Sequence, residues 1–246
     1  MGVVRTARGL APGDVPPLCV LDFDGDLSDG LVRTATAAPV QSWACFHTEM
    51  LGLTLAGLRC GVVPRTIGGP YAVLIAEQLH AAGAKVIVGL TSAGRVAPTL
   101  PLPSLVVAEQ AVRDEGTSLH YLAADRIVAT PTPGMVECLA HELDPLGTVR
   151  RGLVWTTDAP YRETDAQLRT WADAGALAVE MQAASLFAFA QARAARVAVV
   201  ALVSNSVDHS GDQFDTGEHA YRLGVLEAIA RATVSFLEAS APDQRR

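Results

Sequence analysis

Short, mostly apolar segments alternate in this chain with longer amphipathic ones, and this alternation most strongly limits its fold. The apolar segments are typical of buried strands, at 18–21, 58–63, 85–90, 104–107, 149–155, 177–179 and 197–203. Apolar residues recur at helical spacing in 70–83, 133–143, 164–174, 182–194 and 218–237. Strands without a polar face need cover on both sides. The pattern therefore predicts an α/β fold with helices on both faces of the sheet.

Composition narrows the class of protein further. Of the 246 residues, half are hydrophobic and 18% are charged, which suits one compact domain over 1–246. The net charge of −7 argues against nucleic acid as the main partner. No apolar run is long enough for a membrane span, and prolines and charges interrupt 1–18, so a cytoplasmic protein is expected. The four cysteines lack metal-ligand or disulfide-framework spacing.

Four stretches follow predicted strands, where ligands bind in open α/β folds: 24–29, 67–70, 91–94 and 203–208. The small residues of 91–94 would let a ligand approach the backbone. Taken alone, an ordinary turn is the preferred interpretation of that tetrapeptide.

Several polar groups near these stretches have two interpretations each. Asp22, Asp24, Asp26 and Asp29 either hold a divalent metal or form a solvated acidic loop, and the solvated loop is preferred. Glu180 lies at a strand–helix junction, where it accepts hydrogen bonds from sugar hydroxyls or caps the helix. Asp208-His209 supplies an acid or belongs to a surface loop, with the surface loop preferred. The six histidines show no metal-ligand spacing, so no metal is expected.

Taken in order, longer strings in the chain resemble the nucleoside phosphorylase superfamily, particularly its uridine phosphorylase branch. They are FDGD at 23–26, TIGGP at 66–70, TSAG at 91–94, VRDEGTSLHY at 112–121, TTDAPYRET at 156–164 and VEMQAA at 179–184. The resemblance implies a three-layer α/β/α sandwich with a mixed central sheet partly closed into a barrel. It also implies a homo-oligomer, a dimer or a hexamer of dimers. The reaction implied is cleavage of a nucleoside's N-glycosidic bond, with no metal or organic cofactor and with phosphate as co-substrate in the phosphorylases.

The resemblance assigns the sugar site to four residues. Ser92 stands where the family places a threonine that contacts phosphate and ribose, so the hydroxyl is kept. Glu180 and Met181 match the Glu-Met of the sugar-binding motif, with Met181 packing on the ribose. Gln182 replaces a second glutamate that holds two sugar hydroxyls. That replacement loses a charge-assisted hydrogen bond, roughly twice as strong as a neutral one.

The base site implied by the resemblance comprises Ala93, Gly94, Pro160, Tyr161 and Arg162. The uracil-binding Gln-x-Arg of the pyrimidine branch is missing after Tyr161. The purine branch's Ser-Asp, whose aspartate protonates the base, reads Ser204-Asn205 here. Asn205 donates a hydrogen bond but cannot protonate the base, and Asp208 is the substitute if the loop folds back.

The phosphate site departs furthest from the family. Gly25 is kept, but Asp29 replaces an arginine, and Gly52 and Gly89 stand where two further arginines are expected. Arg33, Arg65 and Arg95 are possible replacements. Arg65 is the preferred one, because it enters the loop before Ile67-Gly68-Gly69.

Three functions follow, in order of preference. The first is phosphorolysis of an ordinary or modified nucleoside, with Asn205 and Asp208 as the catalytic candidates. The second is hydrolysis of the same bond, in which Asp29 or Asp26 orients water at the site formed by Gly25, Arg65 and Ser92. The third is a catalytically inactive nucleoside-binding protein on an enzyme fold.

Overall fold

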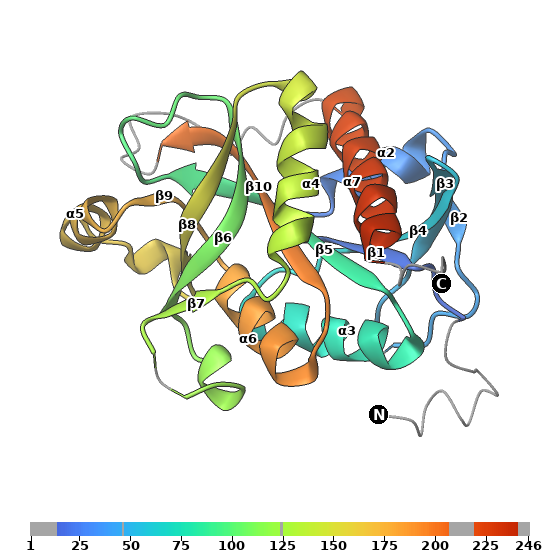
Figure 1. Ribbon diagram of the computed structural model, residues 1–246, viewed down its shortest axis with the longest axis horizontal. Helices are drawn as coiled ribbons and strands as arrows, with labels where there is room; N and C mark the ends of the chain where they lie inside the picture. Colours follow the sequence, from blue (N-terminus) through green and yellow to red (C-terminus); the bar gives the residue numbers. More distant parts are fainter. Residues whose placement is uncertain (1–13, 46, 124, 207–218, 241–246) are drawn as a thin grey trace, which may run out of the picture.

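The computed structural model describes residues 14–45, 47–123, 125–206 and 219–240 (Figure 1). Its strands form one sheet: β1 (Leu18–Asp22), β2 (Ala38–Pro39), β3 (Leu51–Leu55), β4 (Leu58–Pro64), β5 (Val86–Arg95), β6 (Ser104–Asp114), β7 (Ile127–Ala129), β8 (Val149–Thr157), β9 (Ala176–Glu180) and β10 (Val197–Ser206). The helices are α2 (Asp26–Arg33), α3 (Gly69–Ala82), α4 (Pro133–Leu143), α5 (Asp165–Asp173), α6 (Ala183–Arg193) and α7 (His219–Ala239). Short 3₁₀ turns are η1 (Ser118–His120), η2 (Asp144–Leu146) and η3 (Pro160–Arg162).

Helices cover both faces of the sheet, as the apolar strands predict. Figure 1 places α4 and α7 side by side on one face, and α3 and α6 lie on the other. In β1, Cys19 and Leu21 join the core under α3 and α6, whereas Leu18 and Val20 join the core under α4 and α7. Alternate side chains of a strand point to opposite faces. The three-layer sandwich is therefore confirmed.

Half of the sheet closes on itself. The strands β5, β10, β6, β8 and β9 pair in that order, and β9 pairs back with β5. The β10–β6 and β5–β9 pairs are antiparallel and the other three are parallel. This is the mixed, barrel-closed sheet that the resemblance implies. A bulge in β10, between Val203 and Asn205, bends that strand near the closure.

Helix α2 is the main element that the sequence pattern did not predict. It begins after Gly25, whose φ of 92° is left-handed, and it buries Leu27 and Leu31. Gly30 lets α7 approach, because a Cβ there would lie 1.8 Å from Nδ1 of His219. Of the residues expected to form an acidic loop, Asp22 ends β1, and Asp26 and Asp29 lie in α2, which packs against α7.

The remaining helices start and stop close to their predicted bounds. In α5 the N-cap Thr164 and Gln167 form a capping box, which fixes its start. Within the described ranges, no helix has the length and apolar character that crossing a membrane requires.

Candidate functional site

The carboxyl end of β5 is the centre of the candidate site. Gly94 in β5 pairs with Val179 of β9 on one side and with Asn205 of β10 on the other. Glu180 is the residue after Val179, so the Glu-Met-Gln motif begins beside Gly94. The fold thus brings together predicted sugar and base residues from three segments of the chain. The 91–94 tetrapeptide is not a turn, because β5 continues through it to Arg95.

Asp24 binds both donors of Ser92. Its Oδ2 accepts the Ser92 backbone N–H over 2.9 Å and the Ser92 hydroxyl over 2.7 Å. These two groups hold an oxyanion, the Asp24 carboxylate. Ser92 was predicted to hold phosphate. Its two donors can bind such an anion, but in this structure Asp24 occupies both of them.

Arg222, from the first turn of α7, lies directly behind this contact. Its Nη2 donates to Oγ of Ser92 over 3.2 Å and lies 3.4 Å from Oδ2 of Asp26. The side chain is 1% exposed, and its Nε and Nη1 have no hydrogen-bond partner among the described residues. Arg222 was not among the predicted site residues. A signal existed, because Arg222 precedes Val225, Leu226 and Ile229 at the spacing of one helix face.

The four acidic residues differ in their surroundings: Asp29 is exposed and Asp26 is partly exposed, whereas Asp22 is not. Asp22 is fully buried, and its Oδ2 accepts the N–H and the hydroxyl of Ser28 at the start of α2. Burial raises the pKa of Asp22, against the lowering effect of the Ser28 hydrogen bonds and of Arg222. Among the described residues, no group of His, Cys, Asp and Glu side chains is arranged to hold a metal ion. The solvated-loop interpretation is therefore wrong for Asp22.

Arg65 and Asp29 contact each other. Nη2 of Arg65 donates to both carboxylate oxygens of Asp29, over 2.7 and 2.6 Å. Both side chains are more than half exposed. Arg65 also lies against Gly25, where a Cβ would come within 2.8 Å of its Cγ. Arg65, the preferred replacement for the missing arginines, thus lies beside the predicted phosphate loop. It is paired with Asp29, whose negative charge would repel phosphate.

Glu180 caps α6. Its Oε1 accepts the Thr156 hydroxyl over 2.5 Å, and its Oε2 accepts the N–H groups of Gln182 and Ala183 over 2.7 and 2.9 Å. The side chain is buried, and burial raises the pKa of Glu180 to about 7 despite these three bonds. Of the two interpretations offered by the sequence, helix capping describes the contacts of Glu180 in this structure.

The two residues after Glu180 differ in exposure. Met181 is half-buried, whereas Gln182 is 1% exposed and accepts the Met181 N–H over 3.2 Å. Glu180 therefore holds the junction in place, and Met181 is the most exposed part of the predicted sugar motif.

The predicted base segment 160–162 forms the exposed turn η3, and Tyr161 is fully exposed. Burial raises the pKa of the next residue, Glu163, to about 7, so this carboxyl holds a proton in part of the neutral range. Sequence reasoning did not assign Glu163 a role. Asp208 and His209 lie outside the described residues.

The longest strings of the resemblance stabilise the scaffold around the site. Arg113 donates to the carbonyls of Leu122, Ala123 and Asp125. Glu115 accepts the Ser118 N–H and, over 2.6 Å, the Ser185 hydroxyl of α6. These contacts hold the loop after β6 against α6.

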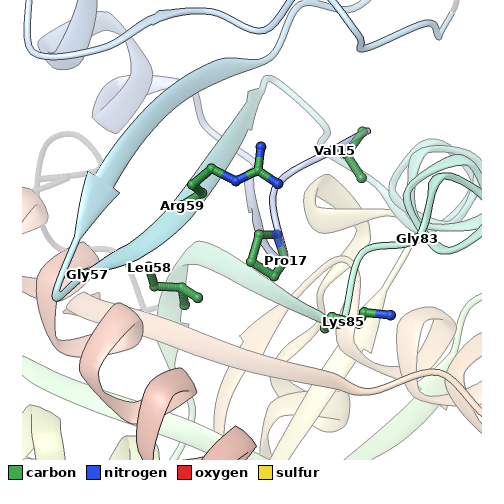
Figure 2. Close-up of a pocket in the computed structure, with 7 residues that line it drawn as sticks. All are labelled: Val15, Pro17, Gly57, Leu58, Arg59, Gly83 and Lys85. Carbon is green, nitrogen blue, oxygen red and sulfur yellow. The ribbon is translucent and has the colours of Figure 1, made fainter. Parts of the chain in front are cut away.

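A pocket of about 320 Å³ lies elsewhere, and Figure 2 shows its lining. Pro17, Leu58 and Lys85 stand at the starts of the parallel strands β1, β4 and β5. Asp24 lies past the opposite end of β1, and Ser92 lies near the opposite end of β5. No predicted site residue lines this pocket.

Comparisons with known proteins place this geometry in a family. The family model described as "Phosphorylase superfamily" matches residues 31–238. A guanosine phosphorylase from Halorubrum lacusprofundi is 28% identical over 57% of this chain and 58% of its own length. A uridine phosphorylase from Treponema pallidum is 28% identical over 61% of this chain and 62% of its own. The chain thus spans about three fifths of these relatives.

The fold has a close match among solved structures. A crystal structure of uridine phosphorylase from Vibrio fischeri superposes with a TM-score of 0.70 and 21% identity, covering 93% of each chain. At this identity the match supports the fold alone.

Proposed function

Because the chain belongs to the phosphorylase superfamily, we propose that it cleaves the N-glycosidic bond of a nucleoside by phosphorolysis, giving a free base and a sugar 1-phosphate. One observation carries the proposal. The Ser92 N–H and hydroxyl hold an oxyanion, beside a buried guanidinium and two residues from Gly94. An anion-binding pair next to the predicted sugar and base residues is what phosphate attack on a nucleoside requires.

In the proposed reaction, a phosphate oxygen bonds to the anomeric carbon as the bond from that carbon to the base nitrogen breaks. The bonding pair leaves with the base, and the sugar passes through an oxocarbenium-like state. Ser92 holds the phosphate, and Met181 and Gln182 contact the sugar. Asn205 hydrogen-bonds the base next to Gly94, and the departing base takes its proton from another donor.

Hydrolysis is the second candidate, and a specific contact favours it. Asp24 occupies the Ser92 donors, so a carboxylate stands where phosphate would bind. A water molecule held by Asp24 would then attack the anomeric carbon as the bond from that carbon to the base nitrogen breaks. Asp24 would take one proton of the water and pass it on to the departing base, which gives a free sugar and a free base.

Products distinguish the two reactions. A panel of purine and pyrimidine nucleosides is incubated with the full chain, with and without phosphate, and sugar products are identified by mass spectrometry. We expect base release that depends on phosphate and is matched by sugar 1-phosphate. Free sugar formed without phosphate supports hydrolysis instead, and no product from any nucleoside contradicts both.

Gln182→Glu is expected to lower the KM for ordinary ribonucleosides about fivefold, because a carboxylate accepts stronger hydrogen bonds from sugar hydroxyls than an amide. Steady-state kinetics on the best nucleoside of the panel measure this. Gln182→Asn, which keeps the amide but shortens the side chain, is the control and should not lower the KM. An unchanged or higher KM in Gln182→Glu would mean that the pocket suits another sugar.

We further propose a cytoplasmic homo-oligomer, a dimer or a hexamer, that needs no metal or organic cofactor. The exposed apolar side chains of Ile67 and Leu119, each 54% exposed, support an interface between copies. Light scattering on the purified full chain tests the assembly.

A further inference from the structure

Two residues that sequence reasoning did not assign to the anion site are joined to Ser92. Asp24 accepts both Ser92 donors, and Arg222 donates to the same Ser92 hydroxyl. The hydroxyl thus receives a hydrogen bond from a guanidinium and gives one to a carboxylate. Charge on both sides strengthens such a chain of hydrogen bonds.

The hydrogen-bond donors of Arg222 are only partly used among the described residues. Its Nη2 lies 4.0 Å from Oδ2 of Asp24 and 3.4 Å from Oδ2 of Asp26, while Nε and Nη1 are buried without a partner in the described structure. Buried polar groups usually have hydrogen-bond partners, so the two unpaired nitrogens leave Arg222, which already contacts Ser92 through Nη2, with donors for a further anion. Asp24 is 21% exposed, and its side chain therefore has room to turn away.

Resting on the proposed function, we infer that Asp24 is an intramolecular competitor for phosphate at Ser92, and that Arg222 is the cation that holds the phosphate once Asp24 has moved. The phosphate would take the Ser92 N–H and hydroxyl that Asp24 now occupies. Arg222 would supply the positive charge that Gly52, Gly89 and Asp29 do not. Asp24 thereby sets the phosphate concentration at which the site is half occupied.

Asp24→Ala and Asp26→Ala form a matched pair for testing this. Each removes one negative charge near Arg222, but only Asp24→Ala frees the Ser92 donors. Binding of inorganic phosphate to the full chain is measured by calorimetry without nucleoside. Loss of one nearby charge should tighten phosphate binding about fivefold in either variant. The phosphate affinity of Asp24→Ala should exceed that of Asp26→Ala by at least about tenfold, because only Asp24→Ala also frees two hydrogen-bond donors for an anion.

Arg222→Met in the Asp24→Ala background should abolish the gain in phosphate affinity. If that double variant does not fold, the comparison of Asp24→Ala with Asp26→Ala decides alone. Equal gains in the two single variants, or no gain in Asp24→Ala, overturn the inference.

Binding and catalysis separate the two claims. Tight phosphate binding by Asp24→Ala in a chain that releases no base keeps the inference and contradicts the proposed function. If the wild type releases base only with phosphate but Asp24→Ala binds phosphate no more tightly, the proposed function is kept and the inference is contradicted.

Discussion

Ser92→Ala is expected to lower kcat/KM for base release about 100-fold, the usual effect of removing one preorganised donor from an anion site. The Ser92 hydroxyl joins Arg222 to the bound oxyanion, so its loss removes a donor and separates the cation from the site. The measurement is base release from the best nucleoside at saturating phosphate.

Ser92→Thr is the matched control, because it keeps the hydroxyl and should retain most of the activity. Ser92 is half-buried, and the thermal transition of both variants should stay near that of the wild type. Wild-type activity in Ser92→Ala would show that Ser92 takes no part in the reaction.

Glu180→Ala is expected to lower the free energy of unfolding by about 3–5 kcal/mol, because it leaves three buried donors without an acceptor. They are the Thr156 hydroxyl and the N–H groups of Gln182 and Ala183. Urea denaturation followed by circular dichroism measures the change. Glu180→Gln keeps one acceptor oxygen and should lose clearly less, whereas equal losses in both variants would contradict the capping role.

The same carboxyl makes stability depend on pH. Burial raises the pKa of Glu180 from 4.5 to about 7, so between these values the folded chain holds a proton that the unfolded chain releases. This contribution is fully present below about pH 4.5 and is lost as pH rises through about 7. The stability of the wild type relative to Glu180→Gln should therefore fall between pH 5 and pH 8. A difference that does not change with pH would contradict the raised pKa.

The fold was predictable because its strongest signals are local. Apolar runs located β1, β4, β5, the first part of β6, β8, β9 and β10, and helical spacing located α3 to α7. The short strands β2, β3 and β7 were not predicted, and two further features were missed for physical reasons. Helix α2 starts at Gly25 with no side-chain cap, and its acidic residues were interpreted as a loop. Strand β5 continues through small residues because β9 and β10 pair with it, which periodicity does not reveal.

The candidate site was predictable only in part. The resemblance located Ser92, Gly94, Asn205 and Glu180, and the strand pairing brings them together. The contact of Asp24 with Ser92 joins residues 68 apart in sequence, so no local pattern reports it. Arg222 had a signal, a charged residue on the apolar face of a helix, but its partners come from β5 and the start of α2.

The family strings have a structural explanation beside the functional one. In VRDEGTSLHY, Arg113 and Glu115 bind backbone and α6, and in TTDAPYRET, Asp158 accepts the Gly116 N–H over 2.9 Å. Thr156 of the second string donates to Glu180. These strings therefore identify the scaffold, whereas the proposed reaction depends on the few residues at the end of β5.

Base release by the full chain tests the central claim most directly. Wild type and Ser92→Ala are each incubated with phosphate and a mixed nucleoside panel, at a protein concentration equal to that of the nucleosides. The free bases are quantified by mass spectrometry. We predict release of at least one base by the wild type and about 100-fold slower release by Ser92→Ala. No base from the wild type, or equal release by both proteins, would contradict nucleoside cleavage at this site.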